Sequence, residues 1–514
     1  MIIIKKEWNA MKHVVYVPLD ERPCNIDFPY QLFDKEYFLI ERLNASILGY
    51  KNKPAWVERI SPWLNNAAKD ADGMVVSIDM LLYGGLIPSR CHHESFEVIE
   101  DRLKIIKKIK AMHPNLTIYA FQTIMRCPGY DGSDAEPDYF KTYGSRIHRY
   151  GRLKHLIDSG EADEENIRAF KDLKIPSSYV DDFVSRRNIN VNAILKALSL
   201  VSENIIDFFV IAQDDSSEYG WTAMDQIIIR KRIRELSVRM KTAMYPGADE
   251  VGVILLARMY NQMKKFKPKL LVKYPSATSA QIIPNIEDRY LDTMVKYHIV
   301  VSGGLVATSL EEADAVVFVN APAYKMLSRL NPKVEGLGMS VLRNMPESLG
   351  FLRYASIEKQ KPVIIADVTY GNGSNLAIYD YLKETGLLFD VAAYGGWNTA
   401  SNTIGCVIAQ GMLFIHNGKT HSHMNFLMLR YLEDIAYQGY VRQHVRDEVL
   451  RDHPTYEYDD VRETNGEIAQ IIKQKLGLFI EEHMKEIKPH VHIKQVSLPW
   501  KRMYEIRLDI EYIK

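Results

Sequence analysis

The sequence predicts an α/β protein built on a mostly parallel β-sheet, and three observations lead to this fold class. Short apolar runs rich in Val and Ile recur along the chain, as expected for strands that are covered on both faces. Segments of helical period separate these runs, and alternation of strand and helix favours parallel pairing. The composition is that of an ordinary globular protein, since 47% of the 514 residues are hydrophobic and 25% are charged.

Eight apolar runs are predicted to be strands. They are continuously apolar rather than alternating, and they lie at residues 13–18, 73–78, 116–121, 208–212, 269–273, 315–319, 362–366 and 389–393. A further run at residues 298–302 is a ninth candidate.

The connections between these runs have helical character. Between the second and third strands, Ile99, Leu103 and Ile106 form an apolar stripe that would face the sheet. Residues 249–264 predict another helix, which has an apolar middle. Residues 127–200 are polar and charged, and they predict a helical insertion that lies on the surface or forms a lid.

Eight strand–helix units favour a (β/α)8-barrel-like fold. The ninth run and the uneven spacing leave an alternative open, which is two doubly wound α/β domains divided near residues 245–267. We expect residues 11–419 to form the α/β catalytic region. Residues 420–514 change to long amphipathic helices and a β-rich end at 491–513, which predicts a small C-terminal α+β appendage.

Charge and cysteine content exclude several classes of protein. Lys+Arg and Asp+Glu each number 65, so the zero net charge favours neither a nucleic-acid binder nor a membrane-surface binder. Four scattered cysteines without a C-x-x-C pair fit a reducing compartment. No apolar run is long enough to span a membrane, and charged residues follow the apolar start at 2–4 directly, so no signal peptide is predicted. We therefore expect a cytoplasmic protein.

Polar side chains follow nearly every predicted strand, which is where ligands bind in parallel α/β folds. Together they would form a cup of carboxylates, arginines and amides with an aromatic wall. The alternative is that they are ordinary turn and helix-cap residues. The substrate-binding candidates are Asp20, Arg22, Asp79, Tyr83, Arg126, Asp367, Asn372, Trp397 and Asn398.

The densest polar cluster is QDDSSE at residues 213–218, and its catalytic candidates are Asp214, Asp215 and Glu218. Carboxylates held close together raise the pKa of one of them, as acid/base catalysis requires. The same spacing would suit a divalent cation, and a structural role also remains open. No nucleotide-binding motif occurs, and we predict neither a cofactor nor a metal site. The acids Asp249 and Glu250 are interpreted as residues of the first turn of the following helix, where the helix dipole stabilises negative charge.

Two resemblances add to this interpretation. The strings YVPLDERPCN, DMLLYGGLIPSR, AQDDSSEYG, PGADE and YGGWNTASNTIG together resemble a bacterial family, domain of unknown function 4127, along most of the chain. That resemblance implies no particular reaction. More locally, the Asp-Asp pair is similar to the catalytic pair of barrel-fold hexosaminidases that use the acetamido group of their substrate. This second resemblance implies that Asp214 orients the acetamido group and that Asp215 protonates the leaving oxygen.

The favoured function is a glycoside hydrolase that acts on a small sugar or glycan fragment, for example an N-acetylhexosaminide. Arg126 is expected to bind substrate through two hydrogen bonds, and Trp397 is expected to stack on a sugar ring. The expected partner is a small carbohydrate, without nucleic acid or membrane, and a homo-oligomer is compatible with the sequence. One alternative is a sugar-binding or regulatory protein without turnover. The other is a metal-dependent hydrolase or lyase with the oxygen ligands Asp20, Asp79, Asp214 and Asp367.

Overall fold

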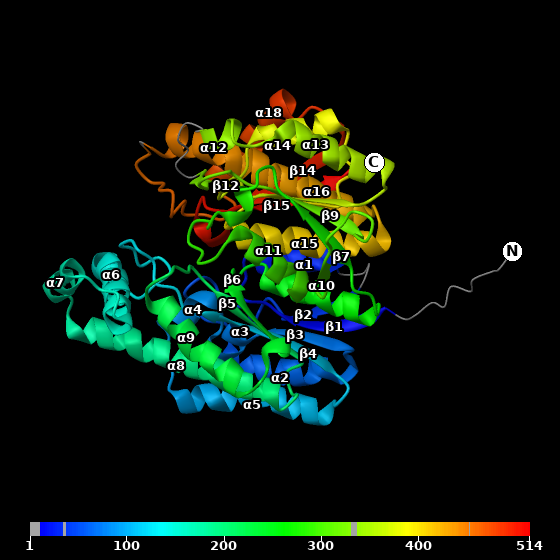
Figure 1. Cartoon of the computed structure of the whole chain (residues 1–514). Helices are drawn as coiled ribbons and strands as arrows, with labels where there is room; N and C mark the ends of the chain where they lie inside the picture. Colours follow the sequence, from blue (N-terminus) through cyan, green and yellow to red (C-terminus); the bar gives the residue numbers. More distant parts are fainter. Residues whose placement is uncertain (1–10, 34–37, 330–336, 452) are drawn as a thin grey trace.

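The computed structural model describes residues 11–33, 38–329, 337–451 and 453–514. The apolar start at residues 2–4 lies outside these ranges. The described chain forms two separate, open parallel β-sheets with helices on their faces, and a two-stranded antiparallel hairpin near its end (Figure 1). Among the described helices, none combines the length and apolar character that crossing a membrane requires.

The first sheet has six parallel strands in the order β2-β1-β3-β4-β5-β6. The order reverses between β1 and β3, and ligands bind beside such a reversal, at the carboxyl ends of the strands. The strands are β1 (Lys12–Val17), β2 (Phe38–Arg42), β3 (Gly73–Ser77), β4 (Thr117–Ile124), β5 (Phe208–Gln213) and β6 (Thr242–Pro246).

Both faces of the first sheet are covered, because successive strand residues point to opposite sides. In β1, Val15 and Val17 pack into one apolar cluster, whereas Val14 and Tyr16 pack into the other. The first cluster is completed by α2 (Val57–Ala67), α3 (Ile78–Tyr83), α5 (Phe96–Met112), α8 (Ser177–Ser202) and α9 (Trp221–Glu235). The second is completed by α1 (Pro23–Phe33) and α10 (Val251–Met263), which lie between the two sheets in Figure 1.

The second sheet has five parallel strands in the order β13-β11-β9-β7-β8. The strands are β7 (Lys269–Lys273), β8 (Leu305–Val306), β9 (Ala315–Asn320), β11 (Val363–Asp367) and β13 (Ala393–Gly395). Its inner helices, α11 (Leu291–Val301) and α15 (Ala400–Asn417), pack against α10. One continuous hydrophobic core therefore joins the second sheet to the facing side of the first.

The remaining elements lie at the outer surface and at the end of the chain. The helices α6 (Phe140–Ser159) and α7 (Glu164–Asp172) project from the first-sheet side in Figure 1. Near the second sheet lie α13 (Met345–Arg353), α14 (Leu376–Thr385), α16 (His421–Arg430) and α18 (Glu467–His483), with the short pair β10 (Leu327–Ser328) and β12 (Tyr370–Gly371). The chain ends in the hairpin of β14 (Val491–Ser497) and β15 (Arg507–Tyr512). Residues 498–506, which connect these two strands, are called the C-terminal loop below.

The barrel prediction is wrong, because both sheets are open. The first sheet ends at β6, whose last residue is Pro246, and the next strand, β7, belongs to the other sheet. The division thus falls between 246 and 269, in the region where the two-domain alternative placed it. The strand predicted at 389–393 is displaced to β13, and the ninth candidate at 298–302 overlaps the end of α11. Strands β2 and β6 were not predicted. The boundary between 419 and 420 stays a prediction.

Candidate active site

A cavity of about 560 Å³ opens at the carboxyl ends of the first sheet. Segments that follow its strands supply Arg22, Arg126, Asp214, Asp215 and Asp249 from loops and Arg90 from the short helix α4 (Leu86–Cys91). The second-sheet side contributes Ile286, Glu287, Asn398 and Asn402, and the C-terminal loop adds Trp500, Arg502 and Tyr504. Residues from the whole length of the chain thus meet around one volume, within the range of small-molecule sites.

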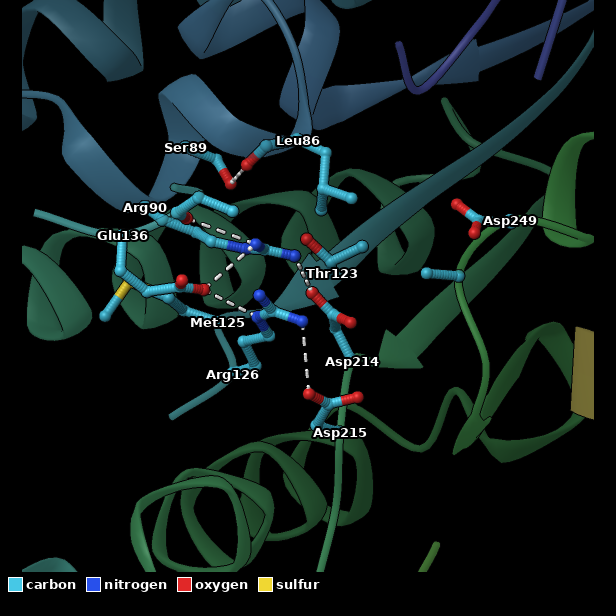
Figure 2. A network of polar contacts seen from close by, with 12 residues as sticks. Leu86, Ser89, Arg90, Thr123, Met125, Arg126, Glu136, Asp214, Asp215 and Asp249 are labelled. Carbon is cyan, nitrogen blue, oxygen red and sulfur yellow. Dashed lines mark hydrogen bonds and ion pairs between the residues drawn. The ribbon is translucent and has the colours of Figure 1, made fainter. Parts of the chain in front are cut away.

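Two arginines bind the adjacent carboxylates at the end of β5 (Figure 2). Arg90 is ion-paired with Asp214, and Arg126 Nη1 donates to Asp215 Oδ2 at 3.2 Å. Both guanidinium groups are fixed from behind by Glu136, whose Oε1 accepts from Arg126 Nε at 2.7 Å and from Arg90 Nη1 at 3.2 Å. Each acid therefore has its own cation, and one carboxylate sets the position of both cations.

The two adjacent acids differ in their protonation. Burial acts to raise the pKa of Asp214, but Arg90 and Arg126 outweigh it and hold the pKa below its ordinary value. Burial also raises the pKa of Asp215, where Arg126 opposes it and the negative charge of Asp214 adds to it, so that the result lies above the ordinary value. The pair therefore provides one ionised carboxylate and one carboxyl group that holds its proton more strongly.

Four of the twelve described non-glycine residues with positive φ angles line the cavity. Asp215, Ile286, Asn398 and Trp500 all line it, and all have positive φ angles, of 48°, 58°, 50° and 54°. This conformation is unfavourable for most side chains, above all for the β-branched Ile286. A backbone hydrogen bond of 2.8 Å from Ser216 N to Ile286 O joins two of the strained loops. Such strain persists where surrounding contacts enforce it, which is typical of functional sites.

A second cluster of charges centres on Arg22. Its Nε donates to Asp20 Oδ2 at 2.9 Å, and its Nη1 and Nη2 donate to both carboxylate oxygens of Asp249 at 3.1 and 2.5 Å. Asn398 Nδ2 also donates to Asp249, at 3.1 Å. Burial raises the pKa of Asp249 to about 6; Arg22 lowers it in part, and Asp20 raises it. The side chain of Asp249, which was interpreted as a helix-dipole acid, is thus the bidentate partner of Arg22 at the cavity wall.

The C-terminal loop is bound directly to the first sheet. The ring of Trp500 lies between two guanidinium groups, with the Cζ atoms of Arg22 and Arg502 at 4.9 and 4.4 Å from its centroid. Its Nε1 donates to Glu21. Tyr504 OH donates to Asn398 Oδ1 at 3.3 Å and also to Asn372. The loop therefore joins both sheets across the cavity.

The chain matches the family described as Protein of unknown function (DUF4127) over residues 14–509. It belongs to this family. A comparison with curated proteins finds no match. Because this DUF4127 chain has no barrel, the local likeness of its Asp-Asp pair to barrel-fold hexosaminidases lacks the fold that would support it.

The structure brings seven of the predicted site residues to the cavity or directly behind it. Five line it, namely Arg22, Arg126, Asp214, Asp215 and Asn398. Asp20 and Asn372 lie one hydrogen bond behind, where Asp20 accepts from Arg22 and Asn372 accepts from Tyr504.

The other five predicted residues do not line this cavity of the DUF4127 chain. Asp79 is buried and accepts from Thr123 N at 2.8 Å, and Tyr83 is stacked on His92 with ring centroids 4.4 Å apart. Asp367 accepts from Asn320 Nδ2 at 2.9 Å.

Trp397 and Glu218 lie elsewhere for different reasons. Trp397 is buried in the core, edge-on to Phe28 at 5.7 Å, rather than exposed to a sugar. Glu218 is exposed and lines a separate cavity with Arg230 and Arg289.

The prediction of the site from sequence missed Arg90, Glu136, Asp249, Trp500, Arg502 and Tyr504 as cavity residues. Arg90 is the last residue of the string DMLLYGGLIPSR, which follows a predicted strand, so its position could have been predicted. Asp249 lies in PGADE and follows β6, a strand that was not predicted. No sequence signal pointed to the C-terminal loop.

The four oxygen ligands of the metal alternative have separate partners, and no described group of three or more His, Cys, Asp or Glu side chains is placed to share a metal ion.

Proposed function

We propose that the cavity hydrolyses a glycosidic bond in a small sugar or glycan fragment, with Asp215 as the general acid. The observation that carries this proposal is the divergence of two adjacent carboxyl groups, since the pKa of Asp214 is lowered and that of Asp215 is raised. Glycoside hydrolysis uses such a pair, in which one carboxyl group donates a proton and the other remains ionised.

In this mechanism Asp215 protonates the oxygen of the leaving group as the bond to the anomeric carbon breaks. A water molecule then forms the new bond to the anomeric carbon, and the proton that it loses returns to the Asp215 carboxylate. Asp214 stays ionised beside Arg90 and stabilises the positive charge that develops on the sugar ring. The left-handed backbone at Asp215 turns its side chain away from the direction of a continued strand, so the two acids can act at different atoms. If the substrate carries an acetamido group, Asp214 orients that group instead.

The size and lining of the cavity support a substrate of this class. A volume of about 560 Å³ admits one or two sugar rings. Guanidinium, amide and carboxylate groups at the wall match the hydrogen-bonding capacity of sugar hydroxyls. Tyr130 and Tyr504 supply aromatic surface at the same wall.

A panel of aryl glycosides, with and without acetamido groups and with and without a chelator, tests the proposal. Asp215→Asn should abolish most activity on substrates with poor leaving groups, but much less on those whose acidic leaving groups need no protonation. Asp214→Asn should impair both kinds of substrate. The surface variant Glu203→Gln removes a charge far from the cavity and serves as control. Equal losses across leaving groups in Asp215→Asn, or binding of sugars without any turnover, would overturn the mechanism.

A further inference from the structure

The cavity has an excess of negative charge. Eight carboxyl groups line it against four guanidinium groups, and neither Lys nor His is among the described lining residues. The carboxyl groups belong to Asp131, Asp134, Glu136, Asp214, Asp215, Asp249, Glu287 and Asp459. Even with two of these acids protonated, the potential in the cavity favours a cation.

The arginines are already paired, so they do not offset this excess for an incoming anion. A carboxylate or phosphate on the substrate would have to displace an internal carboxylate from its guanidinium group, which costs the buried pair. The pairs are Arg22 with Asp20 and Asp249, Arg90 with Glu136 and Asp214, Arg126 with Glu136 and Asp215, and Arg502 with Glu505.

The lining acid Glu287, on the second-sheet wall of the cavity, has no ion-pair partner among the described residues, whereas Asp249 is paired with Arg22. Consecutive residues of α15 bind the main chain of Asp249 and the side chain of Glu287, because Asp249 N donates to Asn402 Oδ1 at 3.2 Å and Ser401 N donates to Glu287 Oε1 at 2.9 Å. Glu287 is 6% exposed, and its second oxygen, Oε2, is buried without a hydrogen-bond partner among the described residues. An unsatisfied carboxylate oxygen in this position costs free energy that a bound donor would recover.

Both lining acids hold their protons more strongly than ordinary carboxyl groups do. Burial raises the pKa of Glu287 to about 8, with Glu250 and Asp288 adding to the effect and hydrogen bonds from Ser401 opposing it. The pKa of Asp249 is raised by burial to about 6. A positive charge bound at Glu287 would lower the pKa of this acid.

We propose that the substrate is an amino sugar with a free amino group, whose ammonium is bound by the carboxyl group of Glu287 on the cavity wall. This inference rests on the proposed glycosidase function and specifies the substrate class of the same site. An ammonium brings three donors and one positive charge, which suits the unpartnered oxygen of Glu287 and the wall as a whole. An N-acetylated sugar lacks that charge and should bind less well.

Calorimetric binding of glucosamine, N-acetylglucosamine and glucose to the full chain tests the inference without requiring turnover. Glucosamine should bind about tenfold more tightly than either neutral sugar, as one charge-assisted contact predicts. Glu287→Gln should weaken glucosamine about tenfold and leave glucose unchanged, whereas the surface variant Glu203→Gln should change neither. Circular dichroism and thermal melts establish that each variant is folded.

The outcomes separate this inference from the proposed function. Selective binding of glucosamine without hydrolysis of any aryl glycoside would overturn the function and retain the ammonium site. Hydrolysis that prefers acetamido or neutral sugars would retain the function and overturn the ammonium site. Equal affinity of the wild-type chain for the three sugars, or sugar binding that requires added Mg²⁺, would also overturn it, and neither result depends on how a variant folds.

Discussion

At the residue scale, the partners of Asp214 and Asp215 decide their different behaviour. The acids are adjacent and both are half-buried, yet Arg90 pairs with Asp214 and Arg126 pairs with Asp215, and each arginine is also bound to Glu136. The sequence predicted the acid pair because it follows a strand, and it predicted that one pKa would be raised. It could not identify Arg90 or Glu136 as partners, because these residues lie 124 and 78 positions away from the pair's first member and nothing local links them.

The charge of Arg126 should set the upper limit of the active pH range. Arg126 lowers the pKa of Asp215, so removing its charge should raise that pKa further. Asp215 must be protonated to act, and activity is therefore lost as pH rises through its pKa. Arg126→Met should move the alkaline limb of kcat/KM upward by about one pH unit.

The matched variant Arg126→Lys retains the charge but loses the planar fork, so the limb should stay near its wild-type position while kcat/KM falls. Carboxyl carbon NMR, with Asp215→Asn for assignment, follows the same titration independently of turnover. An unchanged pKa of Asp215 in Arg126→Met would contradict this account.

At the element scale, the least predictable element is the C-terminal loop. Its residues follow β14 with no glycine-rich or charged motif, and its role arises from contacts with Glu21 and Arg22 at the other end of the chain. The edge strands β2 and β6 were missed for a related reason. In β2, exposed Leu39 interrupts the continuous apolar pattern, and β6 is a short segment that ends in Pro246. The buried strands β3, β4, β5, β9 and β11 are continuously apolar and were predicted closely.

Replacement of Trp500 should separate folding of the sheets from assembly of the cavity. Trp500→Phe retains a ring between Arg22 and Arg502 but loses the donor to Glu21, and should cost about 1–2 kcal/mol in the free energy of unfolding. Trp500→Ala removes the ring as well, and should cost about 3–5 kcal/mol.

In Trp500→Ala, the C-terminal loop should lose its contacts with Glu21 and Arg22 and KM should rise severalfold, while circular dichroism retains the α/β signal. Urea unfolding and steady-state kinetics measure the two effects. A folded Trp500→Ala variant with wild-type kinetics would show that the loop has no part in the site.

At the scale of the whole molecule, the number of apolar runs led to a wrong prediction of a closed barrel. Their uneven spacing led to the alternative of two parts, divided in the region where the structure changes from one sheet to the other. Counting eight apolar runs suggested a barrel, but strand number does not specify which strands pair. The separation is set by α10, an almost completely buried helix that the sequence predicted and that packs between the two sheets. A helix that is apolar on all sides requires cover on all sides, and a second sheet provides it.

The buried acids should make the protein less stable as pH rises above neutral. Burial raises the pKa of Asp79 to about 7, of Glu287 to about 8 and of Glu433 to about 7. In the unfolded chain these groups are ionised by pH 6.5, so the folded state holds more protons and stability falls as pH rises toward 8. The half-buried His92 and the buried His423, with pKa values lowered by burial to about 4, affect only the range below about 6.5.

The free energy of unfolding should therefore decrease between about pH 6.5 and about pH 8, on the order of 2 kcal/mol. Urea denaturation across this range measures the slope. Glu287→Gln removes one of the three groups and should flatten the slope, whereas Glu203→Gln should not. A slope of opposite sign would contradict the protonation of the buried acids.

The link between Glu21 and Trp500, which are 479 positions apart, has a consequence for synthesis on the ribosome. By residue 263 every strand of the first sheet and the helices on both its faces have been made. The cavity still lacks its last wall until Trp500 emerges, roughly 10–50 s later at ordinary elongation rates. A nascent chain in that interval presents an open acidic cleft without a complete site, so the activity should begin only when translation is almost finished.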